Sequence, residues 1–467
     1  MSSTLLIQGG LLVDTEWTRH ADILVEGSKI VHIANKIDET SLPQGTEIVH
    51  ADGLCILPGL IDAHTHYHLV SRGTVTADSF REGSKLAAFG GVTTVVDFAD
   101  DDKQGNLSAC CKSRISAMRK EMAIDFSLHQ GVYSYRPGIE NELADLKKMG
   151  VRTIKIFTTY KNVGYLIDNP EELHKLFEDC KKLGMMVTVH CEDDALIESI
   201  GKDWKGGYAP SAHADLRPSE VEAAGIKTVG EIALDVGMSL YVVHLSSKKG
   251  LEMVRSLRSQ GLDMIVETTP HYLFLDRSKL EGKDGPLYVM TPPLRDKEDN
   301  LALQEALING EIQVVATDHC SFTRAQKLES HDCRTIFPGI PGTEEMLPLI
   351  HTFAFDHGAF GLSQIVNLLS TGPAKAFGLW PTKGSLRVGT DADIVLFDPD
   401  ESWQLNSKTV HSAAGYTAYE GTNVTGRVKT TYLRGRLVMS EGMYLGLPGD
   451  GRFIRQKALM EKGKRWN

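Results

Sequence analysis

The feature that most restricts the fold is a regular alternation of short apolar segments with helix-length amphipathic segments between about residues 55 and 380. Eight apolar segments have the length and composition of buried strands: 55–62, 92–98, 124–131, 151–157, 185–190, 239–244, 264–267 and 312–317. Amphipathic segments typical of helices lie between them, at 80–89, 141–149, 170–183, 219–236, 251–260 and 299–308. Eight strands that alternate with helices predict an α/β fold built on a (β/α)8 TIM-like barrel.

A doubly wound open sheet is the main alternative to the barrel. Such sheets usually have fewer strands and a glycine-rich nucleotide-binding turn after the first strand. The first strand here runs into Asp62, Ala63 and His64, which form no such turn. The barrel is therefore the preferred prediction.

Both ends of the chain have the residue pattern of β-strands joined by turns, without the helix-length segments of the middle. Residues 21–27 alternate with a period of two, and residues 426–438 resemble a hairpin around Arg434 and Gly435. We therefore expect residues 1–54 and 384–440 to form one small β-sandwich domain, with the barrel inserted as residues 55–383. Residues 441–467 would then be a C-terminal tail.

Composition excludes several classes of function. A chain of 467 residues with 42% hydrophobic residues is long enough for two or three domains, and its net charge of -11, without a Lys/Arg cluster, argues against nucleic-acid binding. No apolar stretch approaches the roughly 20 residues of a membrane span. Seven cysteines without zinc-finger spacing or a signal peptide predict a reduced, cytoplasmic protein.

Chemically active residues recur at the ends of the predicted strands. His64 and His66 lie two residues apart, so in an extended chain both imidazoles point to the same side. Residues of the same kind end or interrupt later strands, namely Lys155, His190, His244 and Asp318. In a barrel the carboxyl ends of all strands meet at one mouth, where active sites form. Because neutral imidazole is a common metal ligand, the set predicts a metal centre.

Each of these residues also has a simpler interpretation. A single buried histidine is more often a hydrogen-bonded core residue than a ligand, Lys155 would be explained by an edge strand, and Asp318 by a helix N-cap. These explanations lose force when all the residues share one structural position. A charged lysine inside an apolar strand is costly unless it is paired or neutralised.

Several motifs, spread over nearly the whole chain, resemble one family. They lie at residues 58–66, 73–80, 90–98, 155–161, 217–222, 292–295 and 317–320, beginning with Pro-Gly-Leu-Ile-Asp-Ala-His-Thr-His. Together they resemble the dihydropyrimidinase and hydantoinase group of cyclic amidohydrolases, within the wider amidohydrolase superfamily.

The resemblance implies a binuclear site that holds two divalent metal ions, most often Zn²⁺, with Mn²⁺ or Co²⁺ as alternatives. His64, His66 and Asp318 would bind one ion, and His190 and His244 the other. Lys155, carboxylated on its amine to N6-carboxylysine, would bridge them. A bridging hydroxide would attack the amide, Asp318 would act as general base and proton shuttle, and Tyr160 would donate to the oxygen that gains charge.

Two departures from the family pattern fall in the substrate pocket. Thr291 stands where the family commonly has Ser, and Pro338 where it commonly has Asn; the family contacts the cyclic amide there largely through main-chain atoms. Proline fixes φ and removes a donor, which would reshape the pocket around Pro338.

The implied reaction opens a dihydropyrimidine or 5-substituted hydantoin to an N-carbamoyl amino acid. Two alternatives stay open: an allantoinase-type ureide hydrolase, and a non-catalytic scaffold, which would be expected to lack ligands. The family also implies a homotetramer, in which the C-terminal tail contacts another subunit.

Overall fold

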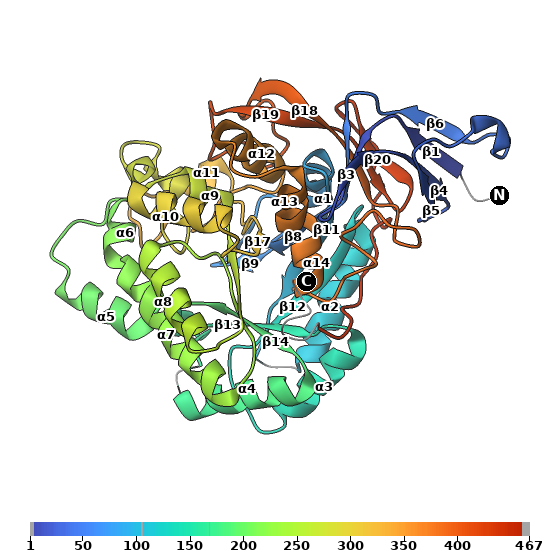
Figure 1. The fold of residues 1–467 in the computed structure, drawn as a ribbon. Helices are drawn as coiled ribbons and strands as arrows, with labels where there is room; N and C mark the ends of the chain where they lie inside the picture. The colour runs from blue at the N-terminus through green and yellow to red at the C-terminus, as the bar shows by residue number, and fades with distance from the viewer. Residues whose placement is uncertain (1–3, 104–105, 168, 460–467) are drawn as a thin grey trace.

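A computed structural model describes residues 4–103, 106–167 and 169–459, and its larger part is a parallel β-barrel (Figure 1). Eight strands lie side by side in chain order: β8 (Leu60–Thr65), β11 (Val92–Ala99), β12 (Asp125–Gly131), β13 (Thr153–Phe157), β14 (Met186–His190), β15 (Leu240–Val242), β16 (Met264–Thr268) and β17 (Val314–Val315). The predicted (β/α)8 fold is confirmed.

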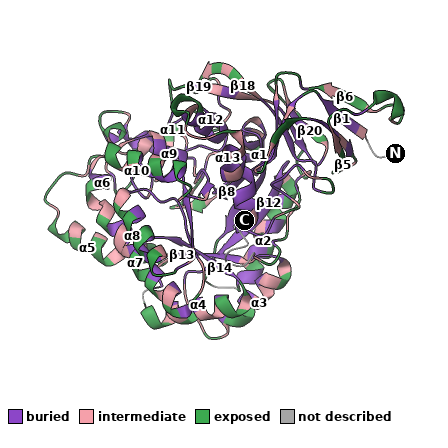
Figure 2. Ribbon diagram, viewed as in Figure 1, coloured by how far each residue is buried: buried purple, intermediate pink, exposed green. Residues whose placement is uncertain are grey.

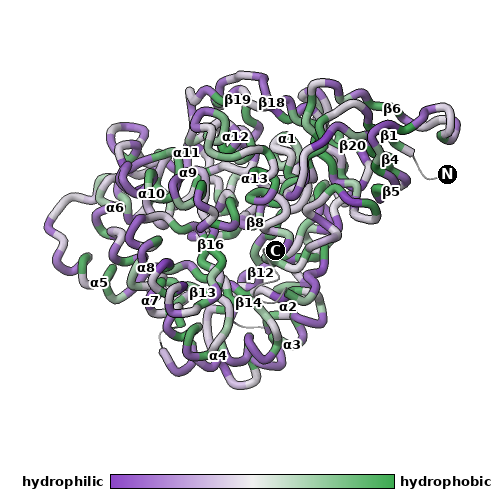
Figure 3. The backbone as a smooth tube through the Cα atoms, viewed as in Figure 1, coloured by the Kyte–Doolittle hydropathy of each residue, from purple (hydrophilic) through white to green (hydrophobic). Residues whose placement is uncertain are grey.

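Each barrel strand is followed by at least one outer helix. The main ones are α1 (Phe80–Phe89), α2 (Leu107–Glu121), α3 (Ile139–Met149), α4 (Pro170–Leu183), α7 (Ser219–Val236), α8 (Lys248–Ser259), α10 (Lys297–Ile308) and α12 (Met346–His357). Figure 2 shows exposed residues on the outer sides of α3, α4 and α7, and Figure 3 shows hydrophobic and hydrophilic residues alternating along α4. These helices bury one apolar stripe against the strands, as their periodicity predicts.

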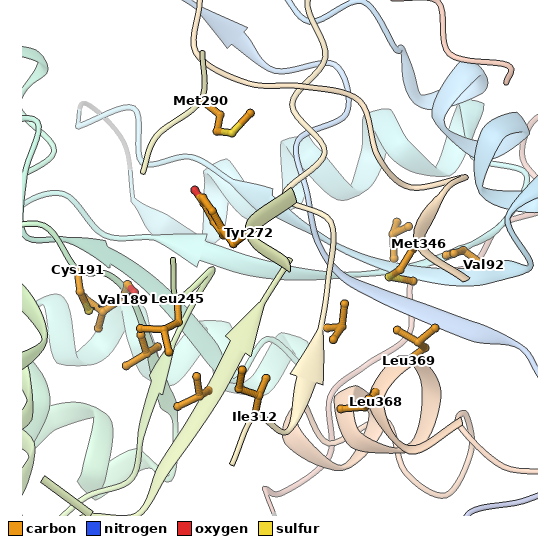
Figure 4. Packing of buried hydrophobic residues seen from close by; sticks show 14 of the residues in the cluster. Val92, Val189, Cys191, Leu245, Tyr272, Met290, Ile312, Met346, Leu368 and Leu369 are labelled. Atoms are coloured by element: carbon orange, nitrogen blue, oxygen red, sulfur yellow. Dashed lines mark hydrogen bonds between the residues drawn. The ribbon is translucent and has the colours of Figure 1, made fainter. Parts of the chain in front are cut away.

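The barrel strands are buried on both faces, which explains why they read as nearly continuous apolar runs. All eight residues of β11 are buried. Figure 4 shows part of the main core, with Val92, Met346 and Leu369 gathered on one side and Val189 and Leu245 on the other.

The barrel closes between its shortest strand, β17, and β8. The side chain of Asp62 joins these two strands in place of a regular ladder of backbone hydrogen bonds. Asp62 Oδ1 accepts from Thr317 N at 3.0 Å. Asp62 Oδ2 accepts from the hydroxyls of Thr317 and Thr343, at 2.5 and 2.9 Å. The His66 amide completes the seam by donating to His319 O at 2.8 Å. Burial raises the pKa of Asp62 to about 6, although the two threonines oppose the rise.

Strands from both chain ends form the smaller part of the molecule. One sheet has the order β5-β4-β1-β6, made of Lys29–Ala34, Asp22–Glu26, Thr4–Gln8 and Glu47–His50. The other has the order β21-β20-β19-β18-β7-β2-β3, made of Met443–Tyr444, Arg436–Ser440, Asn423–Leu433, Ile394–Gln404, Cys55–Pro58, Leu11–Val13 and Thr18–His20. Figure 1 shows β1 and β4 in blue near β20 in red. A shared core, including Ile7, Ile23, Ile56 and Leu396, joins the two sheets.

One predicted strand is wrong: the apolar run 55–62 is two strands that belong to different sheets. β7 (Cys55–Pro58) pairs with β18 and β2, whereas β8 (Leu60–Thr65) pairs with β11. The chain changes sheet at Gly59, whose amide donates to Asp393 O at 2.8 Å, while the next amide donates to Gly91 O at 3.0 Å. A Cβ at residue 59 would collide with the Thr93 side chain. The division of the chain into domains at residues 55 and 384 stays a prediction, and this pairing moves the first change of sheet to Gly59.

A buried lysine connects the barrel to the smaller part. Lys383 Nζ donates to Asp125 Oδ2 at 2.5 Å and to Asp393 Oδ2 at 2.6 Å, and it lies 3.0 Å from Asp391 Oδ2. Asp125 begins β12, so this contact lies at the end of the barrel opposite the strand carboxyl ends. The tail crosses the same end, where Ile454 N donates to Phe126 O at 2.7 Å. Within the described residues, no helix is both long enough and apolar enough to span a membrane.

Candidate metal centre

A cavity of about 390 Å³ lies at the carboxyl ends of the barrel strands. All the residues predicted to form the site line it: His64, His66, Lys155, Tyr160, His190, His244, Thr291, Asp318 and Pro338. The structure thus brings together residues that are up to 274 positions apart, counted from His64 to Pro338 (338 − 64).

The first group in the cavity is formed by β8 and the loop after β17. His64 Nε2 and His66 Nε2 each lie 3.2 Å from Asp318 Oδ1. The alternation of side chains along β8 places both rings on one side, as predicted. Asp318 has a positive φ of 49°, an uncommon conformation for a residue other than glycine that occurs often at functional sites. Burial alone would raise the pKa of Asp318, but His64 and His66 bring it well below its usual range.

The second group is formed by the ends of β14 and β15. His190 Nδ1 lies 3.0 Å from His244 Nε2, and both rings are buried. His244 also has a positive φ, of 38°. Burial lowers the pKa of both imidazoles, so both are neutral near pH 7 and can offer a lone pair to a cation.

Lys155 lies on β13 and faces the same cavity. Its Nζ is 5.3 Å from the ring centre of Phe98 and 5.2 Å from that of Phe157. No carboxylate among the described residues forms an ion pair with it. Burial lowers the pKa of Lys155 to about 8, although the charges of Asp318 and Glu267 oppose the shift. A neutral amine is therefore accessible near neutral pH.

Two buried carboxylates that the sequence analysis did not identify orient these histidines. Glu267 Oε1 lies 2.8 Å from His64 Nδ1, and Glu192 Oε2 lies 2.7 Å from His190 Nε2. Arg217 neutralises Glu192, with Nη1 at 2.7 Å from the same oxygen. Glu267 ends the seventh predicted strand, so the rule that identified the candidate ligands would have identified it too. Glu192 lies two residues after His190, but only the structure shows that its side chain turns back to the ring.

These carboxylates lie where each can accept a proton from one nitrogen of an imidazole. With the proton of His64 on Nδ1, toward Glu267, the Nε2 lone pair is free to bind a cation beside Asp318. With the proton of His190 on Nε2, toward Glu192, the Nδ1 lone pair is free to bind a cation beside His244. Potential ligand atoms of His64, His244 and Asp318 lie within 4.8 Å of one another, so the two groups meet at one metal centre. The donor set of imidazole nitrogens and carboxylate oxygens suits Zn²⁺ and related divalent ions.

Tyr160, Thr291 and Pro338 form a further part of the cavity wall. Tyr160 has a φ of 67°, and the Arg217 guanidinium lies 5.3 Å from its ring centre. Burial raises the pKa of Tyr160 to about 12, against the opposing charge of Arg217, so its phenol remains a hydrogen-bond donor at neutral pH. The Thr291 hydroxyl lies 3.2 Å from His213 Nε2.

His319 follows Asp318 in sequence but points away from the cavity. Its Nε2 donates to Asp78 Oδ2 at 3.0 Å, and its Nδ1 accepts from Gly342 N at 3.1 Å. Both ring nitrogens are therefore engaged in holding the loop, and neither is available to a substrate.

Comparison with known proteins agrees with this geometry. The model of the family described as "Amidohydrolase family" matches residues 55–438. A D-hydantoinase of Ralstonia pickettii is 35% identical over 459 residues, which are 97% of this chain and 99% of that protein. A D-hydantoinase of Geobacillus stearothermophilus is 34% identical over 97% of this chain and 96% of its own length. The crystal structure of dihydropyrimidinase from Brevibacillus agri has a TM-score of 0.94 and 34% identity, and the match covers 98% of this chain and 100% of that one. The resemblance read from the motifs is confirmed, and the chain belongs to the amidohydrolase family.

Proposed function

We propose that this protein is a metal-dependent hydrolase that opens a cyclic amide, a dihydropyrimidine or a 5-substituted hydantoin, to give an N-carbamoyl amino acid. The observation that carries the proposal is the convergence of four imidazoles, one carboxylate and one buried lysine, which has no ion-pair partner among the described residues, in a single cavity. The proteins named as D-hydantoinase and dihydropyrimidinase, which match nearly the full chain, support the same substrate class.

The ligand roles follow the two groups of the site. His64, His66 and Asp318 would hold one divalent ion, and His190 and His244 would hold the other. Lys155, which lines the same cavity, would link the two groups once it is carboxylated. In that step the neutral amine nitrogen attacks CO₂, a C–N bond forms, one C=O π bond becomes a carboxylate C–O bond, and the amine loses a proton to solvent. Zn²⁺ is the metal expected from the imidazole-rich donor set, with Mn²⁺ or Co²⁺ as alternatives.

Bound divalent ions supply a water of lowered pKa and polarise the carbonyl group under attack. Asp318 accepts the proton of the attacking water on its carboxylate and then delivers it to the ring nitrogen that leaves. The Tyr160 phenol donates to the carbonyl oxygen as that oxygen gains charge. The backbone around Thr291 and Pro338 places the ring, and the neighbouring Phe157 and Tyr165 close one wall of the cavity. The atoms of one water are thus divided between the new carboxylate and the released nitrogen.

The assembly and location belong to the same proposal. A homotetramer in the cytoplasm is expected from the resemblance, and all seven cysteines are free, as expected in a reducing compartment. Light scattering on the purified chain would measure the assembly.

A substrate panel tests the proposed reaction. Metal-loaded enzyme is mixed separately with dihydrouracil, a 5-substituted hydantoin and allantoin, and ring-opened product is quantified by chromatography. We expect turnover of dihydrouracil or the hydantoin, with chelator-treated enzyme as control. Turnover of allantoin alone would instead support the ureide-hydrolase alternative. No turnover of any of the three by protein carrying two ions per chain would contradict the proposal.

A further inference from the structure

A second buried lysine lies beside the cavity, outside the metal centre. Lys327 belongs to the short helix α11 (Arg324–Leu328) and is fully buried. Its Nζ donates to three backbone carbonyls: Val289 O at 2.6 Å, Phe337 O at 2.8 Å and Gly339 O at 3.0 Å. No carboxylate within the described residues forms an ion pair with it. All three protons of the ammonium group are thus used on main-chain oxygens.

These carbonyls come from the two segments that carry the cavity residues Thr291 and Pro338. Val289 lies two positions before Thr291, while Phe337 and Gly339 flank Pro338 on both sides. The segments are also joined directly, because Gly339 N donates to Val289 O at 2.9 Å. Lys327 and this amide therefore share one acceptor and hold the two segments at a fixed separation.

The shape of the site requires a cation with several donors. Three carbonyl oxygens that converge on one point repel one another unless a positive group with three N–H bonds lies between them. Gly339 contributes to the tight packing, since it has a φ of 137° and a Cβ there would collide with the Cys320 carbonyl. Burial lowers the pKa of Lys327 to about 7, whereas the three carbonyl dipoles favour its charged form.

We propose that Lys327 is a positioning residue that sets the backbone with which the cavity wall holds the substrate ring. This inference rests on the proposed function, because it assigns the 289–291 and 337–339 segments to ring binding. Lys327 does not touch the reacting atoms. It acts through the main chain of Thr291, Pro338 and Gly339, which line the cavity. Substitution is therefore expected to weaken substrate binding more than the chemical step.

Lys327→Met tests the proposal, with the exposed Lys283→Met as the matched control. We expect KM to rise about tenfold or more, equivalent to the loss of one or two substrate hydrogen bonds, while kcat falls by a smaller factor and metal content stays at the wild-type level. Lys283→Met should have wild-type KM. Propylammonium added to Lys327→Ala should lower KM again, because it restores three N–H donors, whereas propanol should not.

Hydrogen exchange provides a readout that does not depend on turnover. The Gly339 amide should exchange faster in Lys327→Met, whereas amides of the barrel strands should not change. If wild-type enzyme opens no cyclic amide, the proposed function fails, but exchange still decides the role of Lys327. Should Lys327→Met not fold, Lys327→Gln, which retains two donors, should show an intermediate rise in KM and in exchange. Wild-type KM together with wild-type protection of Gly339 in a folded variant would overturn the proposal.

Discussion

Two equally buried lysines lie toward opposite ends of the barrel, in opposite electrostatic surroundings. Lys155 and Lys383 are each 2% exposed. At the cavity, the Lys155 amine lies over two aromatic rings and has no carboxylate ion-pair partner among the described residues. At the other end, Lys383 lies among Asp125, Asp391 and Asp393. Burial lowers the pKa of Lys155 to about 8, whereas at Lys383 the three carboxylates outweigh burial and raise the pKa above its ordinary value.

The difference shows that burial alone does not decide what a lysine does. A buried amine surrounded by carboxylates remains charged and fixes structure, because losing its proton would remove the cation that the carboxylates share. A buried amine without such partners reaches its neutral, nucleophilic form near physiological pH. We therefore propose that Lys155 takes part in the chemistry and that Lys383 stabilises the fold. Four predictions test this contrast, in order of decreasing effect on turnover.

Lys155→Ala should have the largest effect on turnover. If Lys155 links the two ligand sets as proposed, its removal should lower turnover by more than about 10³-fold, since both the ions and the attacking water would lose their arrangement. Metal analysis should show fewer than two ions per chain, while the thermal unfolding temperature changes little. Short carboxylic acids should restore part of the activity. A fully active Lys155→Ala protein with one ion per chain would contradict the role of Lys155 in the reaction.

Asp318→Asn should follow, because the variant keeps its size and one oxygen donor but loses the basic carboxylate. Turnover should fall by about 10² to 10⁴-fold, the contribution of a general base. Metal content should fall less than turnover, because His64 and His66 remain. Asp391→Asn, at the other lysine, is the matched control and should retain turnover within about twofold per folded molecule. Near-normal turnover of Asp318→Asn with full metal would place the base elsewhere.

Tyr160→Phe should cost less, about 10² to 10³-fold in kcat, as expected for one lost donor to the developing oxyanion. Because the pKa of Tyr160 is about 12, the phenol stays protonated through pH 10. The ratio of wild-type to variant kcat should therefore be constant from pH 7 to pH 10 in a pH–rate profile. A ratio that falls steeply across this range would mean that Tyr160 ionises there.

Lys383→Met should affect turnover least and stability most. Removing the cation from three buried carboxylates is expected to lower the free energy of unfolding by about 3–5 kcal/mol, with kcat per folded molecule unchanged. The raised pKa of Lys383 means that its contribution is complete below its ordinary pKa of roughly 10.5 and is lost as pH rises through the folded value. The lowered pKa of Asp391 means that its contribution is lost as pH falls below roughly 4.

The stability difference between wild type and Lys383→Met should therefore shrink as pH rises above the ordinary pKa of lysine and as pH falls into the range where the surrounding carboxylates are protonated. Denaturant unfolding at several pH values measures it. A large loss of kcat in folded Lys383→Met would contradict the claim that Lys383 affects stability and not the reaction.

The residues at the cavity end of the barrel could be predicted from the sequence better than those around Lys383 at the opposite end. His64, His66, Lys155, His190 and Asp318 could be found because strand periodicity and the common mouth of a barrel place strand ends together. These are local signals, each readable within a few residues of the strand concerned.

The partners of Lys383 could not be found in this way. Asp125 begins a barrel strand, while Asp391 and Asp393 come almost 270 residues later, and no local pattern reports that they meet. The change of sheet at Gly59 was missed for a related reason: the strands on either side of it are both fully buried, so the apolar run continues through it. The contacts of Lys327 with the carbonyls of Phe337 and Val289 could not be predicted either, because every residue has a backbone carbonyl and the sequence does not show which of them accept a bond.

The most direct test of the central claim is ¹³C NMR of metal-loaded protein equilibrated with ¹³C-labelled bicarbonate. The account predicts one carbamate carbon signal in the wild-type protein, its absence in Lys155→Ala and its retention in Lys383→Met. Absence of the signal from wild-type protein that carries two ions per chain, or its persistence in Lys155→Ala, would contradict the assignment of Lys155 as the reactive lysine.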